Sequence, residues 1–186
     1  MTERDEHPFG GDEHGLVDLA ELESVARRFT AREFAAAYPL PGLLIELAAG
    51  QEGEGGGAEG ESRHLLTVSV PSVDFMAYVG RVGFLAKRPG NPFPRMISLG
   101  RTSSMDLVLD VRSISKFHGY FEESGGRWHY VDHESTNGTW LNGRRLGAGR
   151  HYPLSGGDRV RFGLELEAVF LPSADLYRRL GGGATA

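Results

Sequence analysis

The sequence predicts an all-β core, an antiparallel β-sandwich of about eleven short strands, with a helical extension before it and a short helix after it. Short segments of apolar and polar residues recur with turn signals between them, and no long helix interrupts them. The 27 glycines and 9 prolines indicate a turn-rich chain. No apolar run approaches the roughly 18 residues of a membrane-spanning helix, and the absence of cysteine excludes disulfides and thiolate chemistry.

The N-terminal third of the chain is expected to form a tail followed by a helical extension. Residues 1–14 are predicted to be a disordered acidic tail, and their polar character argues against a signal peptide. Residues 15–48 form the helical N-terminal extension, because apolar residues recur at helical spacing from Leu16 onward. Thr30 and Glu33 fit a capping box at the start of its second helix. We interpret the extension as a helical cap on the main domain.

A short strand over residues 42–47 is expected to end that extension. Residues 49–62 are rich in glycine and glutamate and are predicted to be flexible. The β-sandwich then covers residues 63–172, and residues 173–186 form a short capped helix and a tail. The strands of the sandwich are predicted at 64–70, 78–86, 96–101, 106–109, 118–123, 127–132, 139–142, 144–146, 158–162 and 164–171.

Charge is distributed unevenly along the chain. Residues 1–62 hold 14 acidic and 4 basic side chains, whereas residues 63–186 hold 11 acidic and 16 basic ones. The basic part would attract an anionic partner. Its surplus is modest for a nucleic-acid-binding domain, so a nucleic-acid reader is a weaker interpretation.

Donor groups gather at predicted strand ends and turns, where a rigid scaffold can present neighbouring loops side by side. The planar guanidinium of Arg101 matches two phosphate oxygens. Compact hydroxyl donors come from Ser115 and Thr136, a mobile positive charge from Lys116 and an amide from Asn137. These side chains are hydrogen-bond donors, and none of them is an evident general base for catalysis. The set suits the binding of a phosphate ester better than catalysis.

Four motifs follow one another in order along the second half of the chain. They are Gly100-Arg101, the segment Ser115-Lys-Phe-His-Gly119, the segment Ser135-Thr-Asn-Gly-Thr-Trp-Leu-Asn-Gly143 and the segment Leu154-Ser-Gly-Gly-Asp-Arg-Val-Arg-Phe-Gly163. This series resembles the forkhead-associated (FHA) domain, a phosphothreonine-binding β-sandwich. The resemblance covers residues 79–171, about half of the chain.

The resemblance implies a role for each matching residue. Arg101 and Ser115 would contact the phosphate, and Lys116 stands where the family often has arginine or asparagine. Thr136 would contact the phosphate or line the pocket for the threonine methyl group, and Asn137 would hydrogen-bond the peptide main chain. Architectural roles fall to Gly100, His118 and Gly138. Arg112 is a possible specificity residue, because the loop before Ser115 can read the third residue after the phosphothreonine; it suggests an acidic preference there.

The function expected from this resemblance is a non-enzymatic, cytoplasmic module that binds a threonine-phosphorylated protein in Ser/Thr kinase signalling. It would need no cofactor or metal and would bind neither nucleic acid nor membrane. The alternative is a phospho-independent scaffold that docks partners through its N-terminal helical segment. Discriminating between them requires a binding assay with and without kinase treatment.

Other interpretations of the same residues remain open at this stage. Ser115 and His118, with Asp106 or Asp110, could form a hydrolase triad, although no nucleophile elbow accompanies them. A metal site is conceivable at His129, Asp132 and His133, although two of these point to opposite faces of a strand. Arg101 could form a structural ion pair with Asp106 or Asp158. Four aromatic residues are expected in the core, namely Trp128, Trp140, Phe162 and Phe170.

Overall fold

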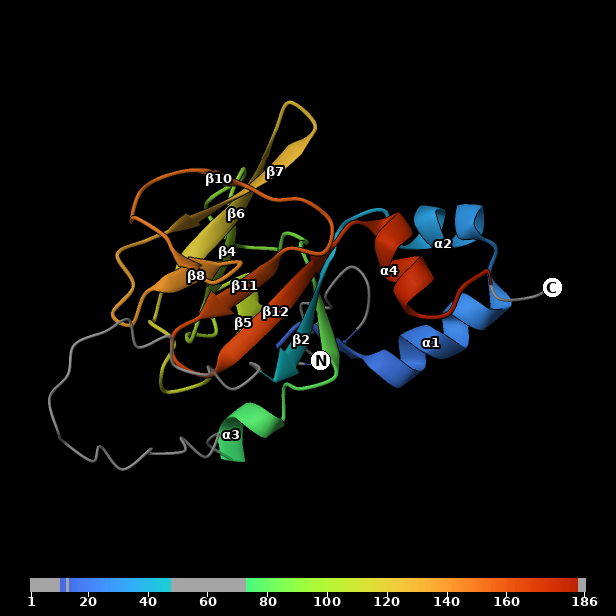
Figure 1. The fold of residues 1–186 in the computed structure, drawn as a ribbon, viewed down its shortest axis with the longest axis horizontal. Coiled ribbons are helices and arrows are strands. Elements are labelled where there is room, and N and C mark those ends of the chain that lie inside the picture. Colours follow the sequence, from blue (N-terminus) through green and yellow to red (C-terminus); the bar gives the residue numbers. More distant parts are fainter. Residues whose placement is uncertain (1–10, 13, 48–72, 184–186) are drawn as a thin grey trace, which may run out of the picture.

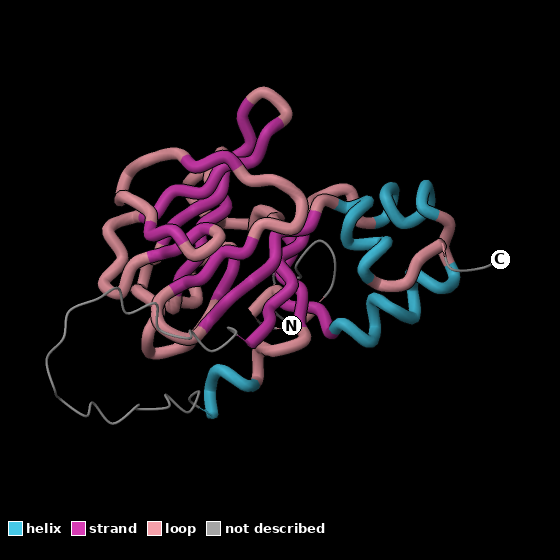
Figure 2. The backbone as a smooth tube through the Cα atoms, viewed as in Figure 1, coloured by secondary structure: helices cyan, strands magenta, loops and turns pink. Residues whose placement is uncertain are grey.

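A computed structural model describes residues 11–12, 14–47 and 73–183, and it contains two β-sheets packed face to face with a helical layer at one side (Figures 1 and 2). The predicted tail 1–14 lies largely outside these residues, as do the predicted flexible segment 49–62 and the predicted strand 64–70. The predicted β-sandwich is confirmed, and β1 and β10 are strands that the sequence pattern did not indicate.

The larger sheet has seven strands in the order β1-β3-β2-β12-β11-β8-β9, and the smaller has five in the order β10-β7-β6-β4-β5. All pairs are antiparallel except β4 and β5, which run parallel. The first sheet comprises β1 (Leu16–Asp18), β2 (Gly42–Leu47), β3 (Arg81–Phe84), β8 (Thr139–Leu141), β9 (Arg144–Arg145), β11 (Arg159–Phe162) and β12 (Leu166–Leu171). The second comprises β4 (Ile97–Gly100), β5 (Leu107–Val108), β6 (Gly119–Ser124), β7 (Arg127–Asp132) and β10 (Tyr152–Pro153).

The main core lies between the two sheets and is rich in aromatic rings. Phe121 of β6 contacts Tyr130 of β7 with ring centroids 4.9 Å apart, and Tyr130 lies 5.4 Å from Phe162 of β11. All three are fully buried. The hydroxyl of Tyr130 has a polar neighbour in Thr139, at 3.3 Å, which satisfies a group that would otherwise be costly to bury. Burial raises the pKa of Tyr130, so the hydroxyl stays neutral.

Three helices form a second core on the outer face of the larger sheet: α1 (Leu19–Arg28), α2 (Ala31–Ala37) and α4 (Ser173–Arg179). Their buried side chains, such as Leu22, Phe34 and Leu176, pack with Leu44 and Val82 of the sheet. The N-terminal helices α1 and α2 therefore form a helical cap on the main domain, as predicted from the sequence. A further single turn, α3 (Val73–Met76), precedes β3. Within the described residues, no helix is both long and apolar enough to span a bilayer.

The helical extension differs in two ways from the prediction. Helix α1 begins at Leu19 rather than Leu16, because the three preceding residues pair with β3 and Asp18 caps the helix by accepting a bond from the amide of Ala20 at 2.8 Å. The boundary expected near residue 63 does not divide two folding units, since β2 lies between β3 and β12 in the larger sheet. The predicted capping box of Thr30 and Glu33 is confirmed, whereas α4 has no side-chain cap.

One of the aromatic residues expected in the core is not there. Trp140 lies between two guanidinium groups, that of Arg161 at 3.8 Å from the ring centroid and that of Arg145 at 5.6 Å. Its register partners on β9 and β11 are these same two arginines, so the three side chains form a row across the sheet. Cation–π attraction holds this ring, and the apolar pattern alone did not reveal it. Phe162 and Phe170 are buried as predicted, and Trp128 packs partly buried against the main core.

Candidate functional site

Three loops at one end of the smaller sheet carry the predicted binding residues. Arg101 directly follows β4, Ser115 and Lys116 precede β6, and Thr136 and Asn137 lie between β7 and β8. Because β4, β6 and β7 are antiparallel neighbours, the end of β4, the start of β6 and the end of β7 meet at one edge. The fold therefore brings the five residues to a common edge, which we call the loop rim.

The first two loops touch through their backbones, and Gly100 permits this. A β-carbon at Gly100 would lie 2.2 Å from the carbonyl oxygen of Lys116, a distance that no side chain can adopt. The amide of Arg101 donates to the carbonyl of Ser115 at 3.0 Å, and the hydroxyl of Thr102 donates to that of Lys116 at 3.1 Å. The close approach fixes the spacing of the arginine-bearing and serine-bearing loops.

The second and third loops are joined by the hydroxyls of Ser115 and Thr136. The Oγ of Ser115 accepts a bond from the amide of Thr136 at 2.9 Å and donates to its Oγ1 at 3.3 Å. Thr136 is exposed and Ser115 half-buried, so both hydroxyls stand at the surface of the rim. Two hydroxyl groups and one backbone amide thus lie within hydrogen-bond distance of one another, in an arrangement that can be shared with an incoming anion.

His118 supports this pair from beneath. Its ring is fully buried, and its Nδ1 accepts the backbone amide of Ser115 at 3.2 Å. Burial lowers the pKa of His118, while the charge of Asp132 and the carbonyl of Gly138 oppose this shift. An Nδ1 that accepts a bond belongs to a neutral ring, so His118 serves the rim as a fixed hydrogen-bonding group.

Asn137 joins the third loop to the second. Its Nδ2 donates to the carbonyl of Ser113 at 2.8 Å, a bond in which Oδ1 takes no part. Gly138 follows with a φ of +85°, which favours glycine, and its carbonyl accepts the amide of Gly163 at 2.9 Å. The amide of Asn137 is therefore held in place before any ligand arrives.

A buried carboxylate shapes the third loop, and sequence reasoning did not find it. Asp132 is 4% exposed and accepts bonds from the amide and the hydroxyl of Ser135 at 2.9 and 2.6 Å. It also accepts the hydroxyl of Thr139 at 2.6 Å. These bonds close the loop that presents Thr136. The signal available in the sequence is an Asp three residues before a Ser, a spacing that favours such side-chain-to-backbone bonds.

The charged side chains of the rim are not neutralised by neighbours. Within the described ranges, no carboxylate lies within 4.0 Å of the charged groups of Arg101, Arg112 or Lys116. The Nε of Arg101 is buried without a hydrogen-bond partner in that part of the chain. The alternative of a structural ion pair for Arg101 is therefore wrong. The two carboxylates considered are occupied elsewhere: Asp106 by Lys87 at 2.9 Å and Asp158 by the side-chain amide of Asn142 at 2.8 Å.

The catalytic and metal alternatives find no support in this geometry. His118 accepts a hydrogen bond from the backbone amide of Ser115 and forms none with its hydroxyl. Asp106 is fully buried, and its carboxylate accepts hydrogen bonds from the amide and the hydroxyl of Ser98. Among the residues that the structure describes, no three His, Asp or Glu side chains are placed to hold a metal ion. His133 instead stacks on the ring of Phe117 at 4.4 Å. In the described part of the chain, the hydroxyl of Ser115 donates to Thr136 and not to a histidine or a carboxylate.

A cleft of about 400 Å³ opens beside the rim, and we call it the rim cleft. Arg101 lines both the rim and this cleft, and Arg112 lines the cleft as well. Neither guanidinium forms an ion pair with a carboxylate in the part of the chain that the structure describes. Its walls come from four separate segments of the chain. The lining residues are His14, Ala77, Tyr78, Arg101, Asp110 and Arg112.

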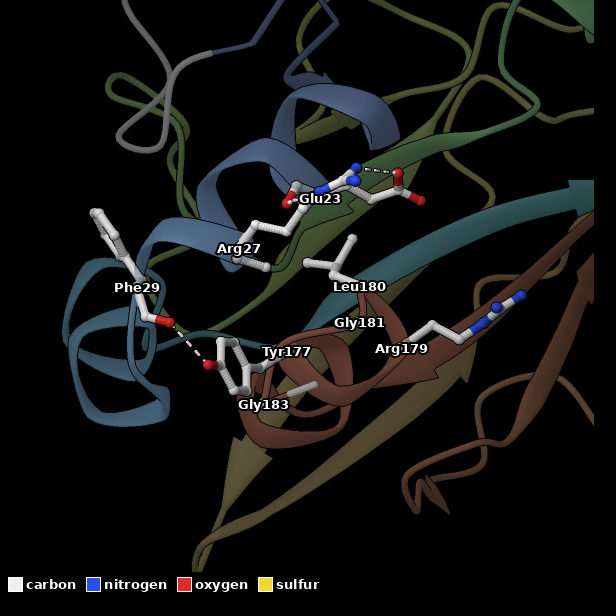
Figure 3. Close-up of a pocket in the computed structure, with 9 residues that line it drawn as sticks. Glu23, Arg27, Phe29, Tyr177, Arg179, Leu180, Gly181 and Gly183 are labelled. Atoms are coloured by element: carbon white, nitrogen blue, oxygen red, sulfur yellow. Dashed lines mark hydrogen bonds and ion pairs between the residues drawn. The ribbon is translucent and has the colours of Figure 1, made fainter. Parts of the chain in front are cut away.

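A second cleft, of about 580 Å³, lies in the helical layer between α1 and α4, and we call it the helix cleft (Figure 3). Its charged side chains are paired: Arg27 contacts Glu23 at 3.2 Å, and Arg179 contacts Glu46 at 3.2 Å. The hydroxyl of Tyr177 donates to the carbonyl of Phe29 at 2.8 Å, as the dashed line in Figure 3 shows. The polar side chains that line the helix cleft are therefore mostly bonded to other groups of the protein.

Comparison with known proteins agrees with the motifs at the rim. A family model described as the FHA domain matches residues 97–163. A protein described as the glycogen accumulation regulator GarA, from Mycolicibacterium smegmatis, is 32% identical over 183 residues, which cover 94% of this chain and 96% of that protein.

Two solved structures that hold phosphopeptides are also similar. EmbR of Mycobacterium tuberculosis, in complex with a low-affinity phosphopeptide, is 25% identical with a TM-score of 0.43; the match covers 50% of this chain and only 22% of EmbR. The N-terminal FHA domain of Rad53p from S. cerevisiae, in complex with a phosphothreonine peptide, is 26% identical with a TM-score of 0.41, covering 46% of this chain and 73% of that domain.

Proposed function

Because this chain belongs to the FHA-domain family, we propose that it is a non-enzymatic module that binds phosphothreonine in a partner protein. The observation that carries the proposal is the state of the loop rim. The hydroxyls of Ser115 and Thr136, the amide of Asn137 and the backbone of Arg101 lie on neighbouring preformed loops, and no carboxylate among the described residues forms an ion pair with Arg101. Such a set is ready for a dianion of the size of a phosphate ester.

Each rim residue takes a distinct part in the proposed contact. The guanidinium of Arg101 and the hydroxyl of Ser115 bind phosphate oxygens, and Lys116 adds a mobile charge at the exposed side. Thr136 contributes its hydroxyl and the apolar surface that receives the threonine methyl group. Asn137 offers its remaining amide atoms to the peptide main chain. Gly100, His118 and Gly138 hold the loops in this geometry.

The proposed partner is a threonine-phosphorylated protein, with a Ser/Thr kinase acting before the binding event and the cytoplasm as the shared compartment. The rim supports binding more than catalysis, because His118, the histidine that contacts Ser115, is a neutral structural group. No cofactor, metal or nucleic acid is needed for this function.

Partner docking through the N-terminal helical segment is the alternative function, and it has less support. The apolar faces of α1 and α2, with Leu22, Ala26 and Phe34, are already buried against α4 and the larger sheet. A helix whose apolar face is buried internally has little of it left for a partner helix.

A peptide-library experiment tests the proposed function. The full chain is immobilised and exposed to degenerate peptides that contain phosphothreonine, phosphoserine or unmodified threonine at the fixed central position. We expect retention of the phosphothreonine pool alone, and loss of that retention in Arg101→Ala. Equal retention of unmodified threonine peptides would contradict the proposal and would favour the phospho-independent alternative.

A further inference from the structure

The rim cleft extends the loop rim with residues from outside the segment that matches the FHA family model. Arg101, Asp110 and Arg112 come from residues 97–163, whereas His14 precedes β1 and Tyr78 lies between α3 and β3. One wall of the cleft is thus specific to the N-terminal part of this chain. Resemblance to the family assigns no function to that wall.

The N-terminal wall is held in place by several bonds. The carboxylate of Asp12 accepts the amides of His14 and Leu16 at 2.9 and 3.0 Å, and its other oxygen forms an ion pair with Arg81 of β3. Strand β1 then pairs with β3 over three residues. The ring of His14 lies edge-on to Tyr78, with centroids 5.8 Å apart. His14 therefore stands in a fixed position beside the cleft.

Tyr78 connects this wall to the loop that precedes the rim serine. Tyr78 is 7% exposed, and its hydroxyl accepts a hydrogen bond from the backbone amide of Asp110 at 3.0 Å. Burial raises the pKa of Tyr78, so the hydroxyl stays neutral. Arg112 follows Asp110 by two residues, and its exposed guanidinium has no ion pair with a described carboxylate. The bond from Tyr78 thus fixes the loop on which Arg112 stands.

The charge within the rim cleft favours an anion. Two guanidinium groups, those of Arg101 and Arg112, face one carboxylate, that of Asp110, and neither is within ion-pair distance of it. The Nδ1 of His14 lies 3.8 Å from the carboxylate of Asp12, which leaves its Nε2 as the ring nitrogen that can donate a hydrogen bond to a ligand. A volume of about 400 Å³ is large enough to admit a side chain as well as water.

We propose that the rim cleft is a second anion subsite, continuous with the phosphate-binding rim through Arg101, and that it binds an acidic side chain next to the phosphothreonine of the same peptide. Arg112 and His14 bind the carboxylate, and Tyr78 positions Arg112 by holding its loop. This inference rests on the proposed function. It further states that the N-terminal segment, through His14, is part of the peptide-binding site.

The test uses short phosphothreonine peptides with an otherwise neutral sequence and a single glutamate moved through each flanking position. Matched peptides carry glutamine instead. In fluorescence anisotropy with the full chain, we expect glutamate to strengthen binding about tenfold at one or more positions, as a charge-assisted bond would. In Arg112→Ala and in His14→Ala this preference falls by at least a factor of about three, while binding of the neutral peptide changes less than about twofold.

Controls separate the cleft from general electrostatics. His133→Ala removes an exposed histidine that stacks on Phe117 and does not line the rim cleft, so it keeps the glutamate preference. Tyr78→Phe loses the bond to Asp110 and weakens the preference without removing a charge. A third peptide set, with a second phosphothreonine in place of glutamate, identifies the source of the anion. Stronger binding of that set, lost in the same variants, supports the subsite with phosphate as its ligand.

Two results would overturn the inference. One is wild-type protein that does not distinguish glutamate from glutamine at any position, and the other is a preference that survives both Arg112→Ala and His14→Ala. An NMR titration with inorganic phosphate keeps the inference testable should no phosphothreonine peptide bind, an outcome that would sink the proposed function alone. The ring signals of His14 should then shift in wild type and not in Arg112→Ala, with the His133 ring as reference.

Discussion

The rim cleft and the helix cleft are both lined by arginines, and they differ in what those arginines contact. In the helix cleft, Arg27 and Arg179 each contact a glutamate at 3.2 Å. In the rim cleft, Arg101 and Arg112 have no ion pair with any carboxylate among the residues described. The larger cleft is thus the one whose charges are already satisfied. Unused hydrogen-bonding capacity, more than volume, distinguishes a candidate binding site here.

The two regions also differ in how their backbones are fixed. The helix cleft is held by apolar packing of α1, α2 and α4 on the larger sheet. The loop rim is held by side-chain bonds to the backbone, chiefly from Asp132, His118 and Asn137. Such bonds leave the donors of the rim exposed in a set geometry, so a ligand meets a preformed site.

The largest expected effect is the loss of phosphopeptide binding in Arg101→Ala. We expect affinity for a phosphothreonine peptide to fall by about 100-fold or more, because a charge-assisted contact to phosphate has no local replacement. Arg27→Ala, in the helix cleft, serves as the matched control and should bind within about twofold of wild type. Isothermal titration calorimetry measures both. Equal losses in the two variants would erase the distinction between the clefts.

The next effect concerns the backbone contact between the first two loops. Gly100→Ala places a β-carbon against the carbonyl of Lys116, so the loops must separate. We expect the free energy of unfolding to fall by about 2–4 kcal/mol and peptide affinity to fall with it. In Gly147→Ala the nearest atoms are side-chain atoms at 3.3 and 3.4 Å, so stability should change little. Urea denaturation compares the two, and an unaffected Gly100→Ala would refute the proposed role of this glycine.

A smaller effect follows from the buried histidine beneath the rim. Because burial lowers the pKa of His118 from 6.5, the unfolded chain binds a proton there more readily than the folded chain. The free energy of unfolding is therefore unaffected by the titration of this histidine above pH 6.5. It decreases as the pH falls through 6.5 toward the lowered pKa of the folded protein, because the unfolded chain takes up the proton first. His118→Asn keeps an acceptor for the amide of Ser115 but cannot titrate.

The measurement is the midpoint of thermal unfolding at about pH 7.5 and about pH 5.5 for both proteins. We expect the wild type to lose more stability on acidification than His118→Asn does. A larger loss in the variant would show that the histidine is charged in the folded protein.

The smallest effect is expected in the helix cleft. Glu23→Gln breaks an exposed pair with Arg27 on one helix face, where solvent screens the charges. Such i,i+4 pairs contribute only about 0.3–0.5 kcal/mol, and less at high salt. Urea denaturation should therefore show a change near the limit of detection, with peptide binding unaltered. A loss of peptide binding in this variant would mean that the helical layer takes part in recognition.

Much of the fold could be predicted because the deciding signals are local. The tight turn at Asn142-Gly143, where both residues have a positive φ, and the alternation over residues 127–132 are encoded in adjacent residues, and β7 spans those six positions. The two-residue strand β10 has too few residues to show a period. The sequence pattern did not separate strand β1 from helix α1, because the apolar residues of β1 fit the helical period as well as the strand period. Only the pairing of β1 with β3 shows that these residues form a strand.

The site was predicted less completely, because its supporting residues are polar and lie far apart in the sequence. Motifs identified the exposed donors at the rim. They did not identify Asp132, although its spacing to Ser135 is a local signal for the bonds that close the third loop. They gave no sign that His14 would line the cleft beside Arg101, because that position depends on the docking of β1 on β3, which residue spacing does not encode.

The central claim is that the rim, with the guanidinium of Arg101 and the joined hydroxyls of Ser115 and Thr136, is where a phosphothreonine binds. An NMR titration of the full, isotopically labelled chain with a phosphothreonine peptide tests it most directly. We predict large amide shifts at Arg101, Ser115 and Thr136 and none at the α1 and α4 residues around Arg27 and Tyr177. Shifts concentrated in the helix cleft, or equal shifts with the unphosphorylated peptide, would contradict the account.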